Sequence, residues 1–191
     1  MTNKSKIVYH NPITEQNMTK SEYSLFNKTL QFQKKYFQDI EDVILMNVSE
    51  DAKKFMPKTA VDFYEWTLNV VDKNDDFTGE CTGFWKVINI VPSRINNRVL
   101  LHEMIHAYES MLSDYKIEHE YLIVKLYQKL LSKIPNLIKI IEIDINKDNR
   151  EHTVFFLLKS LDIDLELKLP FGSVYGYGRE ELYKNNCYEL K

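Results

Sequence analysis

The chain has 191 residues, of which 44% are hydrophobic and 13% aromatic, a composition typical of a folded globular protein. Its formal net charge of −3 excludes a global positive field that would draw it to nucleic acid or to an anionic membrane. The two cysteines, Cys81 and Cys187, exclude a disulfide-dense scaffold, and neither lies in a C-x-x-C pair.

The polar residues 1–18 are predicted to form an extended or loosely packed lead-in, followed by a single domain over residues 19–191. A helix is predicted from Thr19 to about Asp39, because Thr19 and Glu22 have the spacing of a capping box and an apolar stripe follows. The short apolar run at residues 41–48 indicates a strand. Bulky residues alternate over 62–71, which favours a strand, with a helix as the alternative.

The clearest strand signal covers residues 85–91, and Pro92 ends it. A helix is predicted over 98–112, and another begins near His119 and is interrupted at Pro135. Residues 137–145 form a helix or a strand, and residues 154–169 a helix followed by a strand. In that strand Asp162, Asp164 and Glu166 alternate with apolar residues, so we expect them to face water and not a metal.

Residues 102–106 have the sequence His-Glu-Met-Ile-His, which matches the H-E-x-x-H pattern of zinc proteases. Two imidazoles four residues apart project from one face of a helix about a turn apart, close enough to share one Zn²⁺. Glu103 then serves as general base toward a water molecule held by the metal. On a helical wheel, His102, His106 and Glu109 cluster outside a broad apolar arc, and Glu103 lies at its border.

Catalytic zinc takes three protein ligands and leaves one position for water, so a third ligand is needed. His119 is the predicted ligand, because it opens the next helix thirteen residues after His106. The other candidates, each an imidazole or a carboxylate, are Glu118, Glu120, His152, Glu142 and Glu109. Glu109 is better suited to orient His106 by a hydrogen bond, since it lies on the same helix as the first two ligands.

Residues 100–108, Leu-Leu-His-Glu-Met-Ile-His-Ala-Tyr, resemble the active-site motif of the SprT-like (Spartan-type) metalloproteases. In that family a downstream His followed by an aromatic residue and a helix completes the zinc site, and His119 and Tyr121 match this loosely, with Glu120 where the family has Gly. A mitochondrial family of zinc proteases shares a similar core. The chain lacks the four cysteines of the zinc ribbon that is frequent among SprT-like proteins, and it shows no basic DNA-binding tail.

The resemblance implies an α+β, zincin-like fold in which the active-site helix packs beside a small mixed sheet with further helices. It also implies cleavage of proteins, often DNA-associated ones. In zincin-type proteases a strand flanking the cleft can pair with an extended substrate, and residues 85–91 are a candidate for that role.

The function predicted from these features is zinc-dependent hydrolysis of peptide bonds in a protein or peptide substrate. Oxyanion donors remain open among Tyr108, Tyr121, Tyr175, Tyr177 and Arg179. One alternative is a non-catalytic zincin-like binding module with a structural or vestigial metal site, and another is a helical protein in which the motif arose by chance. No signal peptide and no long apolar stretch is visible, so the expected location is intracellular (cytoplasmic or nuclear), soluble and away from membranes.

Overall fold

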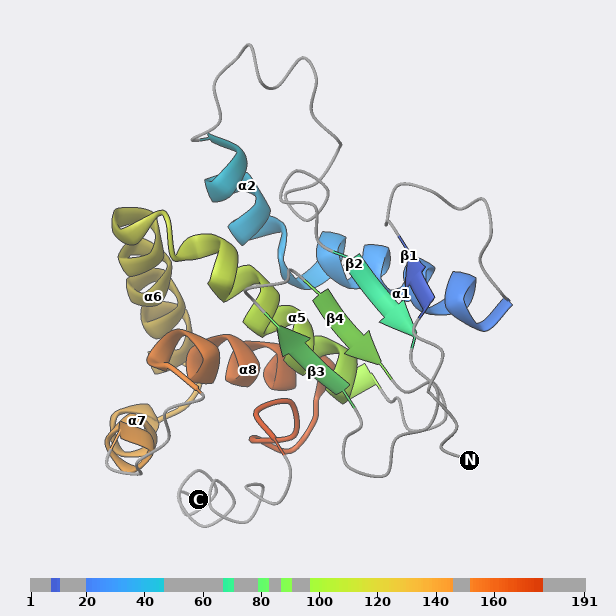
Figure 1. Cartoon of the computed structure of the whole chain (residues 1–191). Coiled ribbons are helices and arrows are strands. Elements are labelled where there is room, and N and C mark those ends of the chain that lie inside the picture. The colour runs from blue at the N-terminus through green and yellow to red at the C-terminus, as the bar shows by residue number, and fades with distance from the viewer. Residues whose placement is uncertain are drawn as a thin grey trace. The chain divides into compact units, whose positions relative to one another are not determined.

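A computed structural model describes residues 8–10, 20–46, 67–70, 79–82, 87–90, 97–145 and 152–176 (Figure 1). The chain divides into two compact units, Met1–Leu112 and Ser113–Lys191. The first contains a small sheet and three helices, and the second contains three helices, counted over the described residues. A single domain over residues 19–191 stays a prediction.

The first two helices of the N-terminal unit are α1 (Lys20–Tyr36) and α2 (Gln38–Met46). Helix α1 confirms the helix predicted from Thr19, although the chain bends at Phe37 before α2 begins. The strand predicted for residues 41–48 is wrong. Phe37, Ile40, Glu41 and Ile44 are buried at the i, i+3, i+4, i+7 spacing of a helix, and a short apolar run does not distinguish a helix from a strand.

Within the described residues, four short strands form one sheet in the order β1-β2-β4-β3. Their bounds are Val8–His10 for β1, Thr67–Val70 for β2, Gly79–Thr82 for β3 and Val87–Ile90 for β4. Strand β1, within the predicted lead-in, runs antiparallel to β2. Strand β2 runs parallel to β4, and β3 runs antiparallel to β4. Strands β2 and β4 confirm the strands predicted within 62–71 and 85–91.

Helix α5 (Asn97–Leu112) lies against β3 and β4 and also contacts α2 (Figure 1). The apolar arc predicted for this helix is confirmed, because every residue in it is buried: Leu100, Leu101, Met104, Ile105, Ala107, Tyr108, Met111 and Leu112. Burial on the sheet and on α2 therefore fixes the rotation of α5 about its own axis.

The C-terminal unit contains α6 (Lys116–Leu131), α7 (Leu137–Ile145) and α8 (Val154–Leu167). Helices α6 and α7 both pack against α8. The Thr153 side chain caps α8 by accepting a hydrogen bond from the backbone N–H of Phe156 at 3.2 Å. At the other end Lys168 takes a left-handed conformation with φ of 55°, which ends the helix.

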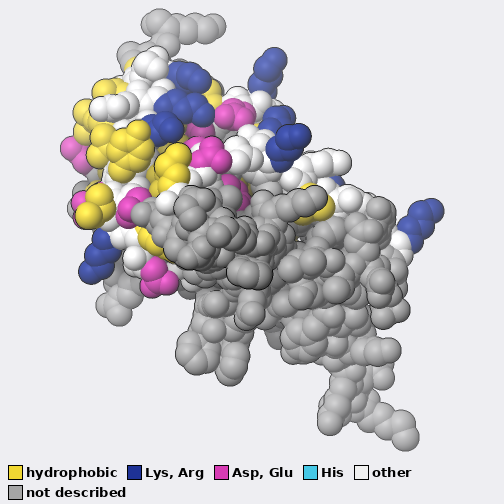
Figure 2. Space-filling model, turned by 90° about the horizontal axis from the view of Figure 1, so that it is seen from above, with side chains coloured by type: hydrophobic (Ala, Val, Ile, Leu, Met, Phe, Trp, Pro, Cys, Tyr) yellow, Lys and Arg dark blue, Asp and Glu magenta, His cyan; other side chains and the backbone are white. Residues whose placement is uncertain are grey.

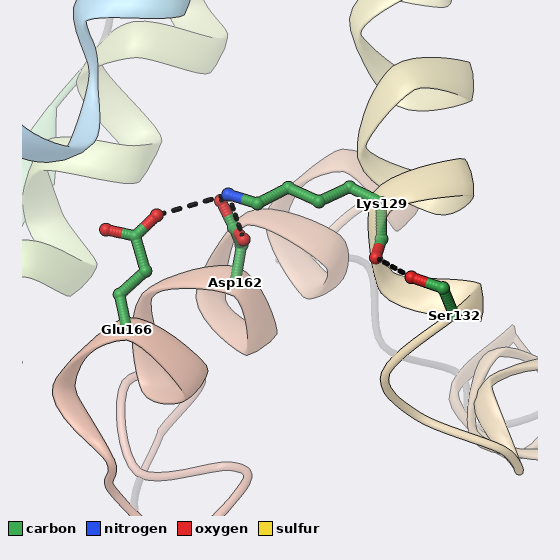
Figure 3. Close-up of polar contacts among 4 residues, drawn as sticks. All are labelled: Lys129, Ser132, Asp162 and Glu166. Carbon is green, nitrogen blue, oxygen red and sulfur yellow. Dashed lines mark hydrogen bonds and ion pairs between the residues drawn. The ribbon is translucent and has the colours of Figure 1, made fainter.

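The strand predicted after the helix in residues 154–169 is wrong, because α8 continues to Leu167. Asp162 and Asp164 are buried and not solvated. Asp162 pairs with Lys129 of α6 at 2.6 Å, and Lys129 also reaches Glu166 at 3.1 Å (Figure 3). Burial works against the charge of Lys129, but the two carboxylates outweigh burial and raise its pKa.

The Asp164 carboxylate organises the turn that follows α8. It accepts hydrogen bonds from the backbone N–H groups of Gly172 at 2.8 Å, Ser173 at 3.1 Å and Val174 at 3.1 Å. The Tyr175 hydroxyl, in the same turn, donates to Asp144 near the end of α7 at 2.7 Å. These buried acids are therefore structural links within the C-terminal unit.

The predicted fold class, an α+β, zincin-like fold with the active-site helix packed beside a small mixed sheet, requires correction. Helices hold most of the described residues, and each strand has only three or four residues. The described part of the chain is therefore mainly helical, with a minor sheet restricted to the N-terminal unit. The prediction erred because residues 41–46 and 162–167, which lie within segments assigned to strands, form parts of helices.

Within the described ranges, no helix combines the length and the apolar character that crossing a lipid bilayer requires.

Candidate metal centre

His102 and His106 lie one turn apart on α5, as their spacing predicts. Each offers a ring nitrogen, and these two nitrogens lie within 4.8 Å of each other. The ring centroids are 5.0 Å apart and the rings are inclined at 76°. Both residues are half-buried, on the side of α5 that lies outside its apolar arc. The pair is thus arranged as two ligands of one ion can be.

The protonation state of His106 suits a metal ligand. Burial lowers the pKa of this imidazole from 6.5 to about 4, and the neighbouring His102 contributes to the shift. The neutral ring is the form that binds a metal, so few protons compete for His106 near neutral pH. This donor set, two imidazoles on one helix, fits Zn²⁺.

Glu103 is buried, with 6% of its surface exposed, and its side chain packs against Gly79 in β3. A methyl group at Gly79 would lie 2.7 Å from Cγ1 of Val99 and 3.2 Å from Cγ and Oε1 of Glu103. Residue 79 must therefore be glycine for β3 to approach α5 this closely. Gly79 was not among the candidate residues predicted from the sequence, although a glycine within a strand is a known sign of close backbone approach.

The strand predicted to pair with an extended substrate lies in the interior of the sheet and not at an edge. Strand β4, within residues 85–91, has β2 on one side and β3 on the other, so neither edge is open. Among the described strands, β3 pairs only with β4 and contacts α5. The edge beside Glu103 therefore belongs to Gly79–Thr82.

Two of the candidate oxyanion donors have other partners. Tyr108 is fully buried, stacks on Phe37 at a centroid distance of 4.5 Å, and donates its hydroxyl hydrogen to the buried carboxylate of Glu41. The Tyr175 hydroxyl is bonded to Asp144. Tyr121 is exposed on α6, whereas Tyr177 and Arg179 lie outside the described residues. Glu41 was not singled out in the sequence, since its apolar neighbours were assigned to a strand.

All candidates for the third ligand except Glu109 belong to the C-terminal unit. Two of them, His119 and His152, contact aromatic side chains of that unit. His119, on α6, sets its ring edge-on to Phe155 with the centroids 5.0 Å apart, and its Nε2 is buried. Burial lowers the pKa of His119, partly offset by Glu120. His152 precedes α8, stacks on Phe156 at 4.2 Å and meets Tyr175 edge-on at 4.8 Å.

The carboxylate candidates differ in exposure. Glu109 is half-buried on α5, next to the side that carries His102 and His106, and Glu118 is half-buried on α6. Glu120 and Glu142 are exposed. An exposed carboxylate loses more side-chain entropy when it becomes fixed to an ion than a ring already held by its neighbours does. The two histidines are thus the better-organised candidates.

Comparison with protein-family models, with curated proteins and with solved structures found no match for this chain. The function therefore has to be argued from the site itself.

Proposed function

We propose that the protein is a zinc-dependent metallopeptidase that hydrolyses peptide bonds, with His102 and His106 as metal ligands and Glu103 as general base. One observation carries this proposal. A single helix presents two imidazole nitrogens within 4.8 Å of each other, and the intervening carboxylate is buried between that helix and β3. A chance motif in a structural helix does not require an acid at this position to be buried against a glycine.

When bound, zinc lowers the pKa of water to about 7 and polarises the substrate carbonyl. Glu103 accepts the proton of the attacking water and later delivers it to the leaving amine. The packing of Glu103 on Gly79 limits the positions available to the carboxylate, and a restricted carboxylate is a better placed base. The edge of β3 that pairs with none of the described strands is the proposed site for pairing with an extended peptide.

The direct test substitutes the base and a ligand separately. We expect Glu103→Gln to retain zinc and to lose peptidase activity by about a hundredfold or more, because the amide cannot accept the proton. His106→Ala should lose both zinc and activity. Cleavage of a casein-type unfolded substrate and zinc content are measured on the same samples. Full activity in either variant would refute the assignment.

Substitution of each candidate third ligand decides between two predictions made from the sequence. His119 is the predicted ligand and His152 the alternative, and each is replaced by alanine in turn. We expect the variant that lacks the true ligand to bind zinc at least about tenfold to a hundredfold more weakly than the wild type. The other variant should retain the zinc affinity of the wild type. Competition with a chromogenic chelator measures the affinity, and unchanged binding in both variants points to a carboxylate ligand such as Glu118.

The competing function is a non-catalytic binding module with a structural metal. It predicts stoichiometric zinc with four protein ligands and therefore no exchangeable position. Addition of a hydroxamate, which occupies an open coordination position, distinguishes the two: it inhibits the peptidase and leaves a closed site unaffected.

A further inference from the structure

Helix α6 exposes an unusual set of large apolar side chains. The exposed fractions are 80% for Ile117, 60% for Tyr121, 52% for Val124 and 43% for Leu131. These are four of the eight exposed large hydrophobic side chains among the described residues, and they lie on one helix. Figure 2 shows a group of exposed hydrophobic side chains with charged side chains around them.

The spacing of these residues places them on one face. With the exposed Gln128 included, positions 117, 121, 124, 128 and 131 follow the 4-3-4-3 pattern of alternating d and a positions in a heptad. The opposite face of α6 carries Leu122, Leu126 and Leu130, which are buried in the C-terminal unit. The exposed residues, which we call the α6 stripe (Ile117, Tyr121, Val124, Gln128 and Leu131), therefore form a second, mainly apolar face outside the core.

Charges beside the α6 stripe indicate what covers it. Glu120 occupies the g position before Tyr121, and Lys125 occupies the e position after Val124; both are exposed. In a parallel pair of helices, a g residue faces the e residue that lies five positions later on the partner. Glu120 therefore faces Lys125 of a second copy, and symmetry gives the pair twice. In an antiparallel pair g faces g and e faces e, so these opposite charges would not meet.

We propose that the α6 stripe is a dimerisation surface, on which α6 packs in parallel against α6 of a second copy of this chain about a two-fold axis. The surface is self-complementary, as a two-fold interface must be. It offers only two heptads, so the dimer is weak and its population depends on protein concentration. This inference does not depend on the proposed peptidase activity.

Sedimentation equilibrium of the full chain over a wide concentration range tests the proposal. Wild-type protein should show a monomer–dimer equilibrium, and Val124→Glu should weaken it by about tenfold or more, because a carboxylate cannot be buried at a d position without a partner. Ile138→Glu on α7 is the matched control, since Ile138 is 53% exposed but lies outside the α6 stripe. It should leave the equilibrium unchanged.

Charge reversal tests the parallel orientation. Glu120→Lys and Lys125→Glu should each weaken the dimer, because each places like charges together, and the double variant should restore it. Circular dichroism checks that each variant is folded. A wild-type protein that is monomeric at every concentration overturns the proposal, as does a dimer that Val124→Glu leaves intact. Failure of the double variant to recover overturns the parallel pairing. Val124→Glu lowering the melting temperature of a monomer would mean that the α6 stripe is covered within the chain, which also overturns it.

Discussion

At the level of single residues, the hydroxyl of Tyr108 donates a hydrogen bond to the carboxylate of Glu41. Both side chains are buried, and the bond joins α5, which carries the two histidines, to α2. Tyr108 therefore contributes to the position of the helix and not to the stabilisation of an oxyanion. The motif alone could not show this role of Tyr108, because an aromatic residue shortly after the second His can lie in the hydrophobic core as readily as in an active site.

The low pKa of His106 predicts how the zinc-free protein responds to acid. The folded state holds the pKa near 4, while the unfolded state has an ordinary value of 6.5. Between these values the unfolded chain binds more protons, so stability is fully present above about pH 6.5 and is lost as the pH falls toward 4. We expect the free energy of unfolding to fall by at most about 2 kcal/mol between about pH 7 and pH 5 from this residue.

Urea unfolding of the zinc-free protein at the two pH values measures this change. His106→Gln has no group that titrates in this range, so it should lose less stability than the wild type over the same interval. Equal losses in the two proteins would mean that His106 titrates normally in the folded state.

At the level of secondary structure elements, the contact between β3 and α5 positions Glu103, the proposed general base. Gly79 allows the strand to lie close to Val99 and Glu103, and a methyl group there has no space, since one contact would shorten to 2.7 Å. Gly79→Ala should therefore separate β3 from α5 and destabilise the fold by about 1–3 kcal/mol.

The same substitution should lower the turnover number of the proposed peptidase more than its zinc affinity, because Glu103 moves while His102 and His106 remain on α5. Denaturant titration, zinc competition and cleavage assays are made on one preparation. Cys81→Ala in the same strand is the control, since it adds no atoms to the interface. A variant as stable and as active as the wild type would show that the close packing has no consequence for Glu103.

The elements that the sequence predicted correctly are those with long, strong periodicity. The apolar arc of α5 runs from Leu100 to Leu112, through most of this 16-residue helix, and its spacing specifies a helix. Helix α8 was misread because buried Asp162 and Asp164 look like solvent-facing residues of a strand; only the tertiary partners Lys129 and the backbone of 172–174 make their burial favourable. Such partners are distant in sequence, so no local pattern could indicate them.

At the level of the whole molecule, the sequence predicted two histidines and an acid on one helix but not their surroundings. His102, Glu103 and His106 follow from the geometry of one helix, whereas Gly79 and Glu41 depend on which strand and which helix pack against it. The choice of a third ligand for the proposed metal site also depends on tertiary packing. His119 and His152 contact aromatic rings of the C-terminal unit, and their distance from His106 in the sequence does not rank them. SprT-like membership and association with DNA stay predictions of the motif.

Zinc content decides most directly whether the two imidazoles form a metal site. Elemental analysis of untagged protein, purified without added metal or chelator, should give about one zinc per chain for the wild type and for Glu103→Gln. It should give far less for His102→Ala and His106→Ala. Wild-type protein without stoichiometric zinc, and unable to bind it when zinc is supplied, would contradict the metal centre and with it the peptidase.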